Sequence, residues 1–362
     1  MPPARSEGVI VAGEIAGASG LAESARILHQ VIADHGKARG LLPLGLPGFV
    51  EMPPTEMAPG AALLAVVNAP ILPPSLLRLP RGSLRGRRVI GFWAWELPAV
   101  PPIWAEGAKF VHEIWAPSRF TAAALEKMVP GRVRVVPYPI AAVDLPAEGE
   151  RADFGLPEGM VIVTTIFNLA SSMARKNPLG AIAAFKAAFG MRRDVLFVLK
   201  LSHVEAYAED LALIRAAIGD APNIRLFTET ISEARLRGLI RASDVVLSLH
   251  RAEGFGLVPA TAMLLGRAVV ATGWSGNMDF MSAETAGLVP YQLVPAEDPR
   301  GTYALAGAEW AEPDVEAAAS LLRRLADDAA GRAAMAAAGR DYAKVRIGAE
   351  PLLAALDAAG VA

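Results

Sequence analysis

The sequence predicts an α/β protein with two doubly wound domains in tandem. Short apolar runs bounded by turn residues alternate with segments of helical periodicity, which is typical of a mostly parallel sheet covered by helices. The alternation lapses between Pro137 and Met160, where prolines, glycines and acidic residues gather, and then resumes. The length of 362 residues also suits two domains better than one. We therefore expect one domain at 1–150 and a second at 151–362.

The elements of the first domain follow in order from this pattern. Val9–Ala12 predicts a strand, and Leu21–Ile32 predicts the next helix because its apolar residues recur on one face. The later apolar runs predict strands at 63–67, 89–93, 113–116 and 133–136, with a helix near 121–128.

The second domain repeats the alternation. Strands are predicted at 161–166, 195–199, 224–227, 245–249 and 268–271, and helices at 178–188, 206–218, 232–240 and 259–265. Pro178 fits an early helical position, where its missing N–H costs nothing. Residues 310–314 are interpreted as a helix start with Pro313 at the first helical position, and we assign them no chemistry. The Ala-rich remainder predicts helices to the end.

The composition excludes several classes of function. The chain has no cysteine, so thiol nucleophiles, disulfides and Cys-ligated metals are ruled out, and its net charge of −2 does not indicate a nucleic-acid partner. No two histidines share an i, i+4 spacing, so we expect no metal site. The uncharged segment 57–77 is long enough to span a bilayer, but its prolines and Asn68 favour a buried strand followed by a loop. We expect a cytoplasmic protein.

Two candidate ligand loops follow strands of the first domain, at the carboxyl ends where doubly wound domains bind ligands. The loop at 13–20 contains Gly17, and its glycines would let an anion approach the next helix N-terminus. A tight turn is an equal alternative, because the spacing is not the dinucleotide fingerprint. Trp93, Trp95 and Glu96 suit a sugar ring, although a pair of core tryptophans with a surface glutamate is the favoured alternative without further context.

The second domain carries three more candidates. Arg175 and Lys176 precede the helix at Pro178, where the helix dipole disfavours cations, so a diphosphate would be a fitting counter-anion and a solvated pair the alternative. Glu253 lies in a glycine-rich loop and can accept hydrogen bonds from hydroxyls, or can simply favour a helix N-terminus. His250 is a candidate ligand residue, although a structural histidine is the more common outcome. Asn277 is also a candidate, and a helix N-cap is the alternative that we weight heavily.

Together these segments resemble the retaining glycosyltransferases of family 4, which have the GT-B fold. The resemblance begins at His250–Leu257 and continues through Ala262, Met263 and Gly266 to Val269–Thr272. Residues 93–98, 115–120, 175–178 and 273–281 match one subgroup of that family. The resemblance covers the chain from Val9 to about Arg340. It implies two Rossmann-like domains facing across a cleft, with the acceptor mainly on the first and the nucleotide-sugar donor mainly on the second. It also implies a final helix that crosses back to the first domain.

The resemblance also implies roles for individual residues. Lys176, with Arg175 beside it, would hold the donor diphosphate, and Glu253 would hold sugar hydroxyls as the first Glu of the family's Glu-x7-Glu motif. The second Glu would fall at position 261, where this chain has Thr261, whose hydroxyl is the one group it can offer to the ribose. The expected donor site is completed by Gly254, Phe255, Gly256, Leu257, His250, Asn277 and Gly17, and the expected acceptor site by Trp93, Trp95 and Glu96.

The activity implied is retaining transfer of a hexose or deoxyhexose in polysaccharide biosynthesis. The donor would be a nucleotide sugar of the GDP-mannose or dTDP-rhamnose type, the acceptor a glycan or a lipid-linked glycan, and neither cofactor nor metal is expected. Two alternatives stay open: a sugar-nucleotide epimerase of the same fold, and a catalytically silent sugar-nucleotide-binding protein, which Thr261 favours. The arginines at 78, 81, 85, 87 and 88 suit anionic headgroups at the inner face of a membrane, although a solvated loop is the preferred alternative.

Overall fold

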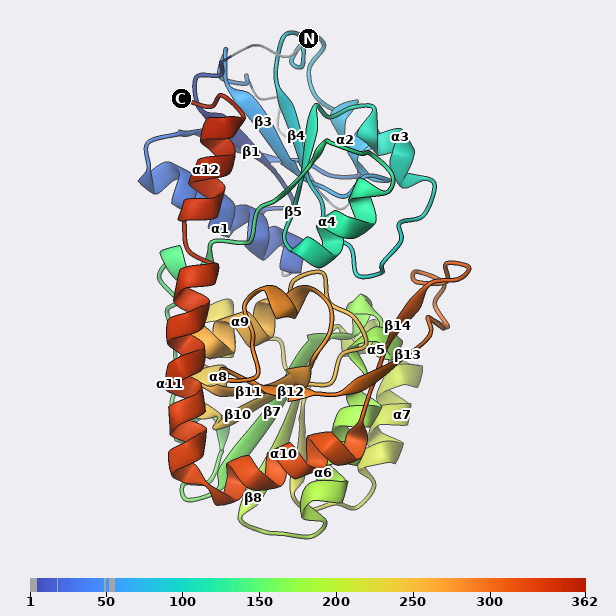
Figure 1. The fold of residues 1–362 in the computed structure, drawn as a ribbon, viewed down its shortest axis with the longest axis vertical. Helices are drawn as coiled ribbons and strands as arrows, with labels where there is room; N and C mark the ends of the chain where they lie inside the picture. The colour runs from blue at the N-terminus through green and yellow to red at the C-terminus, as the bar shows by residue number, and fades with distance from the viewer. Residues whose placement is uncertain (1–4, 18, 49, 52–55) are drawn as a thin grey trace. The chain divides into compact units, whose positions relative to one another are not determined.

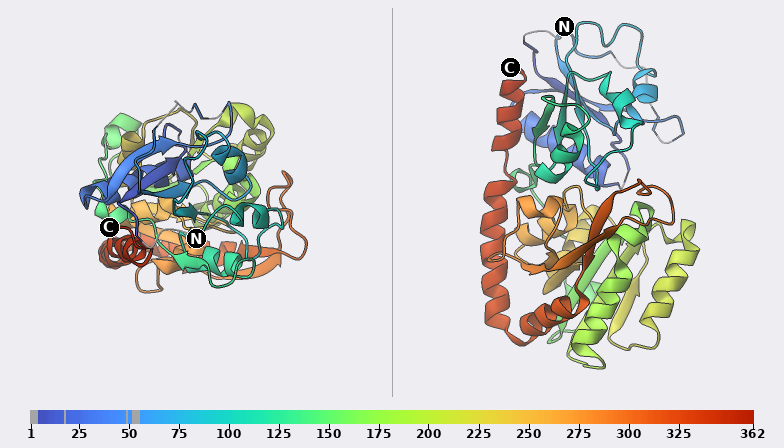
Figure 2. Two further views of the ribbon diagram at one scale, coloured as in Figure 1. Left: turned by 90° about the horizontal axis from the view of Figure 1, so that it is seen from above. Right: turned by 45° about the vertical axis from the view of Figure 1, so that its right-hand side comes forward.

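The chain forms two compact α/β units in the computed structural model, which describes residues 5–17, 19–48, 50–51 and 56–362. The first unit combines Met1–Val143 with Arg346–Ala362, and the second unit is Asp144–Val345. Figures 1 and 2 show a strand layer with helices on both of its sides in each unit. The predicted α/β class is therefore confirmed.

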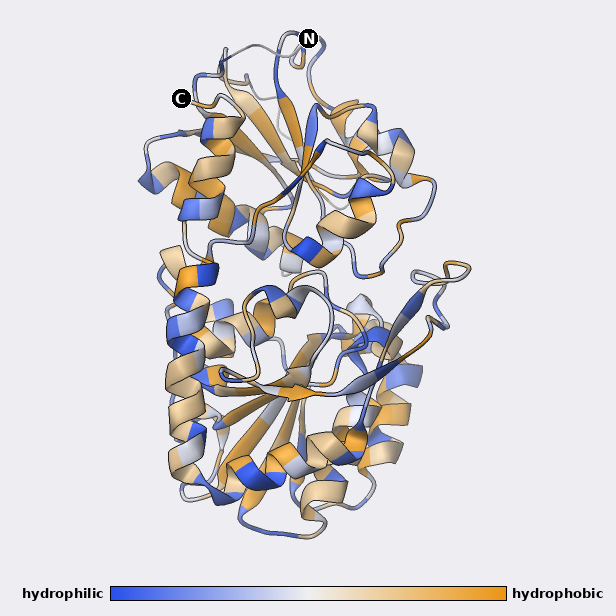
Figure 3. Cartoon of the chain, viewed as in Figure 1, coloured by the Kyte–Doolittle hydropathy of each residue, from blue (hydrophilic) through white to orange (hydrophobic). Residues whose placement is uncertain are grey.

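The first unit contains a six-stranded parallel sheet in the order β2-β1-β3-β4-β5-β6. Its strands are β1 (Val9–Gly13), β2 (Ala38–Pro43), β3 (Ala62–Val66), β4 (Val89–Phe92), β5 (Glu113–Ala116) and β6 (Val133–Val135). The three strands β1, β3 and β4 are buried along their whole length, which explains their continuous apolar sequences. Figure 3 shows the same strands in the hydrophobic colour.

Helices of the first unit connect these strands. They are α1 (Gly20–Asp34), α2 (Leu72–Leu76), α3 (Trp104–Ala108) and α4 (Arg119–Glu126). Ser19 caps α1 by accepting a hydrogen bond from the Ala22 N–H at 3.1 Å. The segment 57–77 is divided between β3 and α2, and among the described residues no helix is long and apolar enough to cross a bilayer.

The end of the chain belongs to the first unit. There the helix α12 (Glu350–Ala358) is followed by Val361, which forms a β-bridge with Ser6. The Lys37 ammonium lies 3.3 Å from the Asp357 carboxylate, and the Ala141 N–H donates to the Ile347 carbonyl at 3.0 Å. The first unit is therefore assembled from two segments that are distant in sequence.

The second unit contains another six-stranded parallel sheet, in the order β12-β11-β10-β7-β8-β9. Its strands are β7 (Val161–Asn168), β8 (Val195–Ser202), β9 (Ile224–Phe227), β10 (Val245–Ser248), β11 (Ala268–Thr272) and β12 (Gly287–Val289). The chain leaves β9 and returns to the far side of β7 to form β10. The carboxyl ends of β7 and β10 therefore border a topological switch point, where doubly wound sheets bind ligands.

Helices cover both faces of this second sheet. One face packs against α6 (Pro178–Phe189), α7 (Ala208–Ile218) and α10 (Val315–Asp327), and Phe185 of α6 stacks on Phe197 of β8 with ring centroids 5.0 Å apart. The other face packs against α8 (Glu233–Ala242) and the short helix η2 (Arg151–Phe154). The helices α9 (Leu257–Leu264) and α11 (Ala329–Arg346) complete the unit.

The division between the units lies at Val143 and Asp144 because the following residues pack on α8. The Glu148 N–H donates to the Ala234 carbonyl at 2.9 Å. The backbone of Gly238 comes so close to this segment that a Cβ there would lie 1.7 Å from the Glu148 carbonyl oxygen. A glycine is therefore required at 238 for the connection to lie flat on the helix.

Residues 310–314 correct the sequence prediction. They do not start a helix: β14 (Glu309–Pro313) pairs antiparallel with β13 (Tyr291–Pro295), and α10 begins at Val315. Asp314 is the N-cap and accepts a hydrogen bond from the Ala317 N–H at 2.9 Å. Pro313 is tolerated at the end of a two-stranded ribbon, where its missing N–H does not interrupt the hydrogen bonds between the two strands. The prediction was wrong because a proline and acidic residues mark an edge strand as well as a helix start.

Candidate functional site

Three charged side chains meet at the carboxyl edge of the second sheet. Arg175 and Lys176 follow β7, and Glu253 follows β10, the strand that pairs with β7. The Arg175 guanidinium lies 3.2 Å from one oxygen of the Glu253 carboxylate, and the Lys176 ammonium pairs with the other oxygen. The exposed fractions of these side chains are 4% for Arg175, 20% for Lys176 and 9% for Glu253. The cluster therefore holds one buried cation, one accessible cation and one buried anion.

The loop after β7 is shaped by two residues with left-handed backbone angles. Ser172 has φ of 70° and caps the short helix α5 (Met173–Lys176), whose last turn carries both cations. Asn177 has φ of 52°, ends α5, and accepts a hydrogen bond from the Gly180 N–H as the N-cap of α6. This conformation is one that Asn tolerates better than most residues. The double cap turns the chain sharply between the cations and Pro178.

The two cations precede the N-cap of the Pro178 helix, as expected. They also lie in the last turn of the short helix α5, which the sequence prediction did not include. The local need for an anion is met by Glu253. Since the cluster has two cations and one carboxylate, it still carries one net positive charge.

The electrostatics of the cluster fix the charge on Glu253. Burial alone would raise the pKa of the Glu253 carboxyl, but the charges of Lys176 and Arg175 outweigh it and lower that pKa to about 2. Glu253 is therefore an ionised carboxylate at neutral pH. It can accept hydrogen bonds and cannot donate one.

Arg175 is held in place by the loops around it. Its guanidinium donates to the Ala252 carbonyl at 2.8 Å and to the Ser171 carbonyl at 3.0 Å, and it lies 5.4 Å from the centre of the Tyr303 ring. The Arg175 carbonyl in turn accepts from the Arg251 N–H at 2.7 Å. These contacts join the loop after β7 to the loop after β10 through Arg175.

Gly254 in the loop after β10 and Gly276 in the loop after β11 allow the two backbones to touch. A Cβ on Gly276 would lie 2.3 Å from the Gly254 carbonyl oxygen, so this position accepts only glycine. The Glu253 N–H donates to the Ser275 hydroxyl at 2.8 Å, and the Gly276 N–H donates to the Glu253 carbonyl at 2.9 Å. The contacts of residues 273–277 thus fix the backbone position of Glu253.

The beginning of α9 lies directly after this contact. Gly256 has φ of 98° and is the residue before Leu257, which starts the helix. Phe255 is buried against Phe280, with ring centroids 5.0 Å apart. Thr261 lies one turn further along α9 and is 6% exposed. The loop 254–257 therefore places the N-terminus of α9 beside Glu253.

His250 and Asn277 form a buried pair beneath the cluster. The His250 Nε2 lies 3.1 Å from the Asn277 Oδ1, and its Nδ1 lies 2.9 Å from the Ser248 hydroxyl. The Asn277 side-chain amide donates to the Thr272 carbonyl at 3.0 Å. Burial lowers the pKa of His250 below its ordinary value. The N-cap interpretation of Asn277 was therefore wrong, and the structural alternative fits His250.

The remaining candidates, Gly17, Trp93, Trp95 and Glu96, lie in the first unit. Gly17 is covered by its own loop, since a Cβ there would lie 1.7 Å from the Glu14 carboxylate, which favours the tight-turn alternative. Trp93 and Trp95 are buried and pack on Trp104 with ring centroids 5.9 and 5.1 Å apart. This burial favours the core alternative over stacking on a sugar. Glu96 is half-buried beside them.

Several supporting residues were not foreseen from the sequence. The Ser172 hydroxyl donates to Asp298 at 3.0 Å, and Asp298 also accepts from the Tyr303 N–H at 3.2 Å. The Arg251 Nε lies 2.5 Å from the Glu312 carboxylate. These partners come from the ribbon β13–β14 and its connecting loop, which carry no recognisable motif. Within the described part of the chain, no three His, Asp or Glu side chains gather as a metal site would require.

Known structures with this architecture have the GT-B fold, and the chain shares it. HepE of Anabaena in complex with UDP and glucose has a TM-score of 0.69 and 13% identity over 97% of this chain and 100% of its own. Sucrose-phosphate synthase from Thermosynechococcus elongatus has a TM-score of 0.68 and 17% identity over 98% of this chain and 100% of its own. A glycosyltransferase from Rickettsia africae has a TM-score of 0.67 and 12% identity over 98% of both chains. The expected pair of Rossmann-like domains is confirmed.

Residues 192–307 match the family model of group 1 glycosyltransferases. This segment begins after α6, includes the loop that carries Glu253, and ends in the loop between β13 and β14. No curated protein matches the chain significantly. The family match and the GT-B fold together support a glycosyltransferase.

Proposed function

We propose that the chain is a retaining glycosyltransferase that transfers a hexose or deoxyhexose from a nucleoside diphosphate sugar to a glycan or lipid-linked acceptor. The observation that carries the proposal is the Glu253 carboxylate held between Arg175 and Lys176 at the topological switch point of the second sheet. Further support comes from HepE, which was crystallised with UDP-glucose and with UDP. The donor we propose is of the GDP-mannose or dTDP-rhamnose type.

Lys176 is proposed to bind the donor diphosphate. Its ammonium is the more accessible of the two cations, whereas Arg175 is engaged with backbone carbonyls and with Tyr303. When a diphosphate binds, it competes with Glu253 for this ammonium. The carboxylate of Glu253 is then available for the sugar hydroxyls, and a carboxylate is an acceptor suited to paired hydroxyls.

The chemistry follows from where charge develops in the transition state. The bond between the anomeric carbon and the diphosphate breaks, and negative charge builds on the leaving phosphate. Lys176, Arg175 and the N–H groups at the start of α9 would stabilise that charge in a fixed arrangement. The acceptor hydroxyl attacks on the face that the phosphate leaves and gives its proton to the departing phosphate oxygen. Every proton and charge is then accounted for without a protein nucleophile or a metal.

Thr261 is proposed to face the nucleotide ribose from α9. Its single hydroxyl can make one hydrogen bond where a glutamate could make two. This difference would weaken nucleotide binding without preventing it. Asn277 and His250 would hold the loops after β10 and β11 together and would not contact the donor.

The acceptor side is proposed to lie at the inner face of a membrane. Arg81, Arg85 and Leu77 are exposed, whereas Arg87 donates to the Ala58 carbonyl and Arg88 pairs with Glu113 at 3.4 Å. Two exposed cations beside an exposed leucine suit the headgroups of anionic lipids. Equal co-sedimentation of the Arg81→Gln/Arg85→Gln double variant and the wild type with anionic vesicles would count against this location.

The decisive experiment measures nucleotide binding and turnover separately in the Glu253→Gln variant. We expect the variant to bind the free nucleoside diphosphate and to lose about 100- to 1,000-fold in turnover, by analogy with removal of one transition-state hydrogen bond. EDTA should leave wild-type activity unchanged. Glu284→Gln, an exposed carboxylate of the same unit, is the matched control. Donor conversion without an acceptor would support an epimerase instead, and binding without turnover on any acceptor would support a silent binder.

A further inference from the structure

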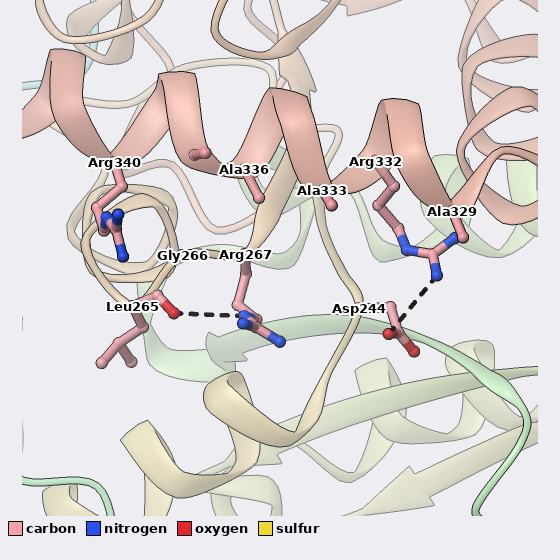
Figure 4. Close-up of a pocket in the computed structure, with 10 residues that line it drawn as sticks. Asp244, Leu265, Gly266, Arg267, Ala329, Arg332, Ala333, Ala336 and Arg340 are labelled. Atoms are coloured by element: carbon pink, nitrogen blue, oxygen red, sulfur yellow. Dashed lines mark hydrogen bonds and ion pairs between the residues drawn. The ribbon is translucent and has the colours of Figure 1, made fainter.

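A pocket lies at the end of the second sheet that is opposite to Glu253. Its volume is about 360 Å³, and it is lined by Asp244 and Arg267 together with residues of α11, as Figure 4 shows. Asp244 directly precedes β10 and Arg267 directly precedes β11, so the pocket is at the amino ends of the strands. Glu253 follows the carboxyl end of β10. The two sites are therefore separated by the length of the sheet.

The hollow exists because the facing side of α11 carries small residues. Ala329, Ala333 and Ala337 are spaced four residues apart, and Arg332, Ala336 and Arg340 form the neighbouring row. Residues with this spacing share one side of a helix. Alanine side chains end at Cβ, so they leave space between α11 and the turn at 265–267. Figure 4 shows Arg332 and Arg340 at the two ends of that space, with Arg267 opposite.

The pocket carries more positive than negative charge. Three arginines line it, and Asp244 is the one acidic residue among its described lining residues. Asp244 is already engaged, because its Oδ2 accepts from the Arg151 guanidinium and from the Ile162 N–H, both at 2.7 Å. Arg332 lies 4.0 Å from the other oxygen of Asp244. The lining therefore holds a net charge of +2, before Arg151 is counted.

The two remaining arginines make weak contacts with the protein. Arg267 donates to the carbonyls of Leu265, Arg241 and Ser243 at 3.3 Å, which is long for a hydrogen bond. Arg340 pairs with its neighbour Asp341 at 3.6 Å and is 46% exposed. Burial lowers the pKa of Arg267, Asp244 raises it, and the nearby arginines lower it further.

We propose that this arginine pocket, lined by Asp244, Arg267, Arg332, Arg340 and the alanines of α11, binds a phosphate monoester. A phosphate monoester carries a charge close to −2 at neutral pH, which complements the net charge of the lining. Guanidinium groups bind phosphate oxygens in pairs, and Arg267 and Arg340 have donors that the protein uses weakly. The volume lies in the range of small-molecule sites and exceeds what a phosphate group needs. The alanine wall offers apolar surface to a compact ring attached to the phosphate.

The test titrates ribose 5-phosphate into the full chain by calorimetry, with ribose as the uncharged reference. We expect binding of the ester and none of the sugar. Arg340→Glu reverses an exposed charge that supports little of the fold, and it should weaken binding by about tenfold or more. Ala333→Leu should narrow the pocket and weaken ribose 5-phosphate more than inorganic phosphate. Arg324→Gln, an exposed arginine of α10 outside the pocket, is the matched control and should bind as the wild type does.

The two phosphate sites are distinguished by Lys176→Ala. This variant should retain the binding of ribose 5-phosphate, and loss of that binding would place the ester at the Glu253 cluster and overturn the proposal. Equal affinity in the wild type and Arg340→Glu would overturn it as well. Vesicles of phosphatidylcholine with phosphatidic acid test a lipid source of the same group. Binding of these vesicles that is sensitive to Arg340→Glu, without binding of ribose 5-phosphate, would support a lipid phosphate. Failure of both probes would refute the site.

Discussion

The carboxylate of Glu253 pairs with the ammonium of Lys176 although 77 residues separate them in the chain. The contact joins the loops after two adjacent parallel strands, β7 and β10. The carboxyl of Glu253 has an unusually low pKa, and the Lys176 side chain is partly exposed to solvent. Both properties can be measured independently of any substrate.

Acid should weaken the contribution of Glu253 to stability. Its pKa is about 2 in the folded chain and 4.5 in its ordinary state, so the contribution is complete above about pH 4.5 and is lost as the pH falls toward 2. Thermal unfolding of the wild type and Glu253→Gln should show a difference in Tm that shrinks over this interval. A difference in Tm that is independent of pH would contradict the ion-pair assignment.

Lys176→Ala should weaken the binding of nucleoside diphosphates by about 10- to 100-fold, which corresponds to the loss of one hydrogen bond to a charged group. The substitution also leaves the Glu253 carboxylate less neutralised, which repels the diphosphate further. Calorimetric titration with UDP, GDP and dTDP would measure the change. Lys186→Ala is the control, because the Lys186 ammonium donates to the Ala217 carbonyl on the outside of the same unit. Equal losses in both variants would place the diphosphate elsewhere.

Thr261→Glu should tighten the binding of a nucleoside diphosphate, because a carboxylate offers the ribose two acceptors. Inorganic pyrophosphate lacks the ribose, so its affinity should not rise with this substitution. Thr261→Val keeps the shape of the side chain and should weaken nucleotide binding several-fold, as expected for the loss of about 1 kcal/mol. Weaker nucleotide binding in Thr261→Glu would mean that the carboxylate is buried without a partner.

Asn277→Ala should lower the free energy of unfolding by about 1–3 kcal/mol, because it removes the buried hydrogen bonds that Asn277 makes to His250 and to the Thr272 carbonyl. Asn277→Asp keeps an acceptor for His250 but buries a carboxylate against the Thr272 carbonyl, so it should lose at least as much. Denaturant unfolding of the two variants and the wild type would measure this order. An Asn277→Ala variant with wild-type stability and impaired donor binding would instead assign Asn277 to the donor.

The sequence was most informative about the buried parallel strands. Val9–Gly13, Ala62–Val66 and Val245–Ser248 are short apolar runs whose burial on both faces leaves a continuous signal. Two strands were missed because they lack this signal: Ala38–Pro43 is mostly half-buried or exposed, and Tyr291–Pro295 is largely exposed. The edge strands Val133–Val135 and Ile224–Phe227 were nevertheless predicted.

The candidate site shows the same limit at the level of single contacts. The residues Arg175, Lys176 and Glu253 were visible because charged groups follow apolar strands. The pairing among them was not, since it depends on the return of the chain from β9 to the other side of β7. Trp93 illustrates the opposite case, because an aromatic motif that suits a sugar also suits a buried core. Sequence patterns therefore indicate which polar residues lie near a site more readily than they indicate which of those residues pair with one another.

The C-terminal segment Arg346–Ala362 has a consequence for synthesis of the chain. It contributes α12 and the partner of Ser6 to the first unit, yet it is translated after the whole of the second unit. The second unit is contiguous from Asp144 to Val345, so it can complete its fold while the first unit still lacks a helix. Of the two units, the one whose translation starts first is thus the one that is completed last, and a stop codon near residue 345 would damage the first unit more than the second.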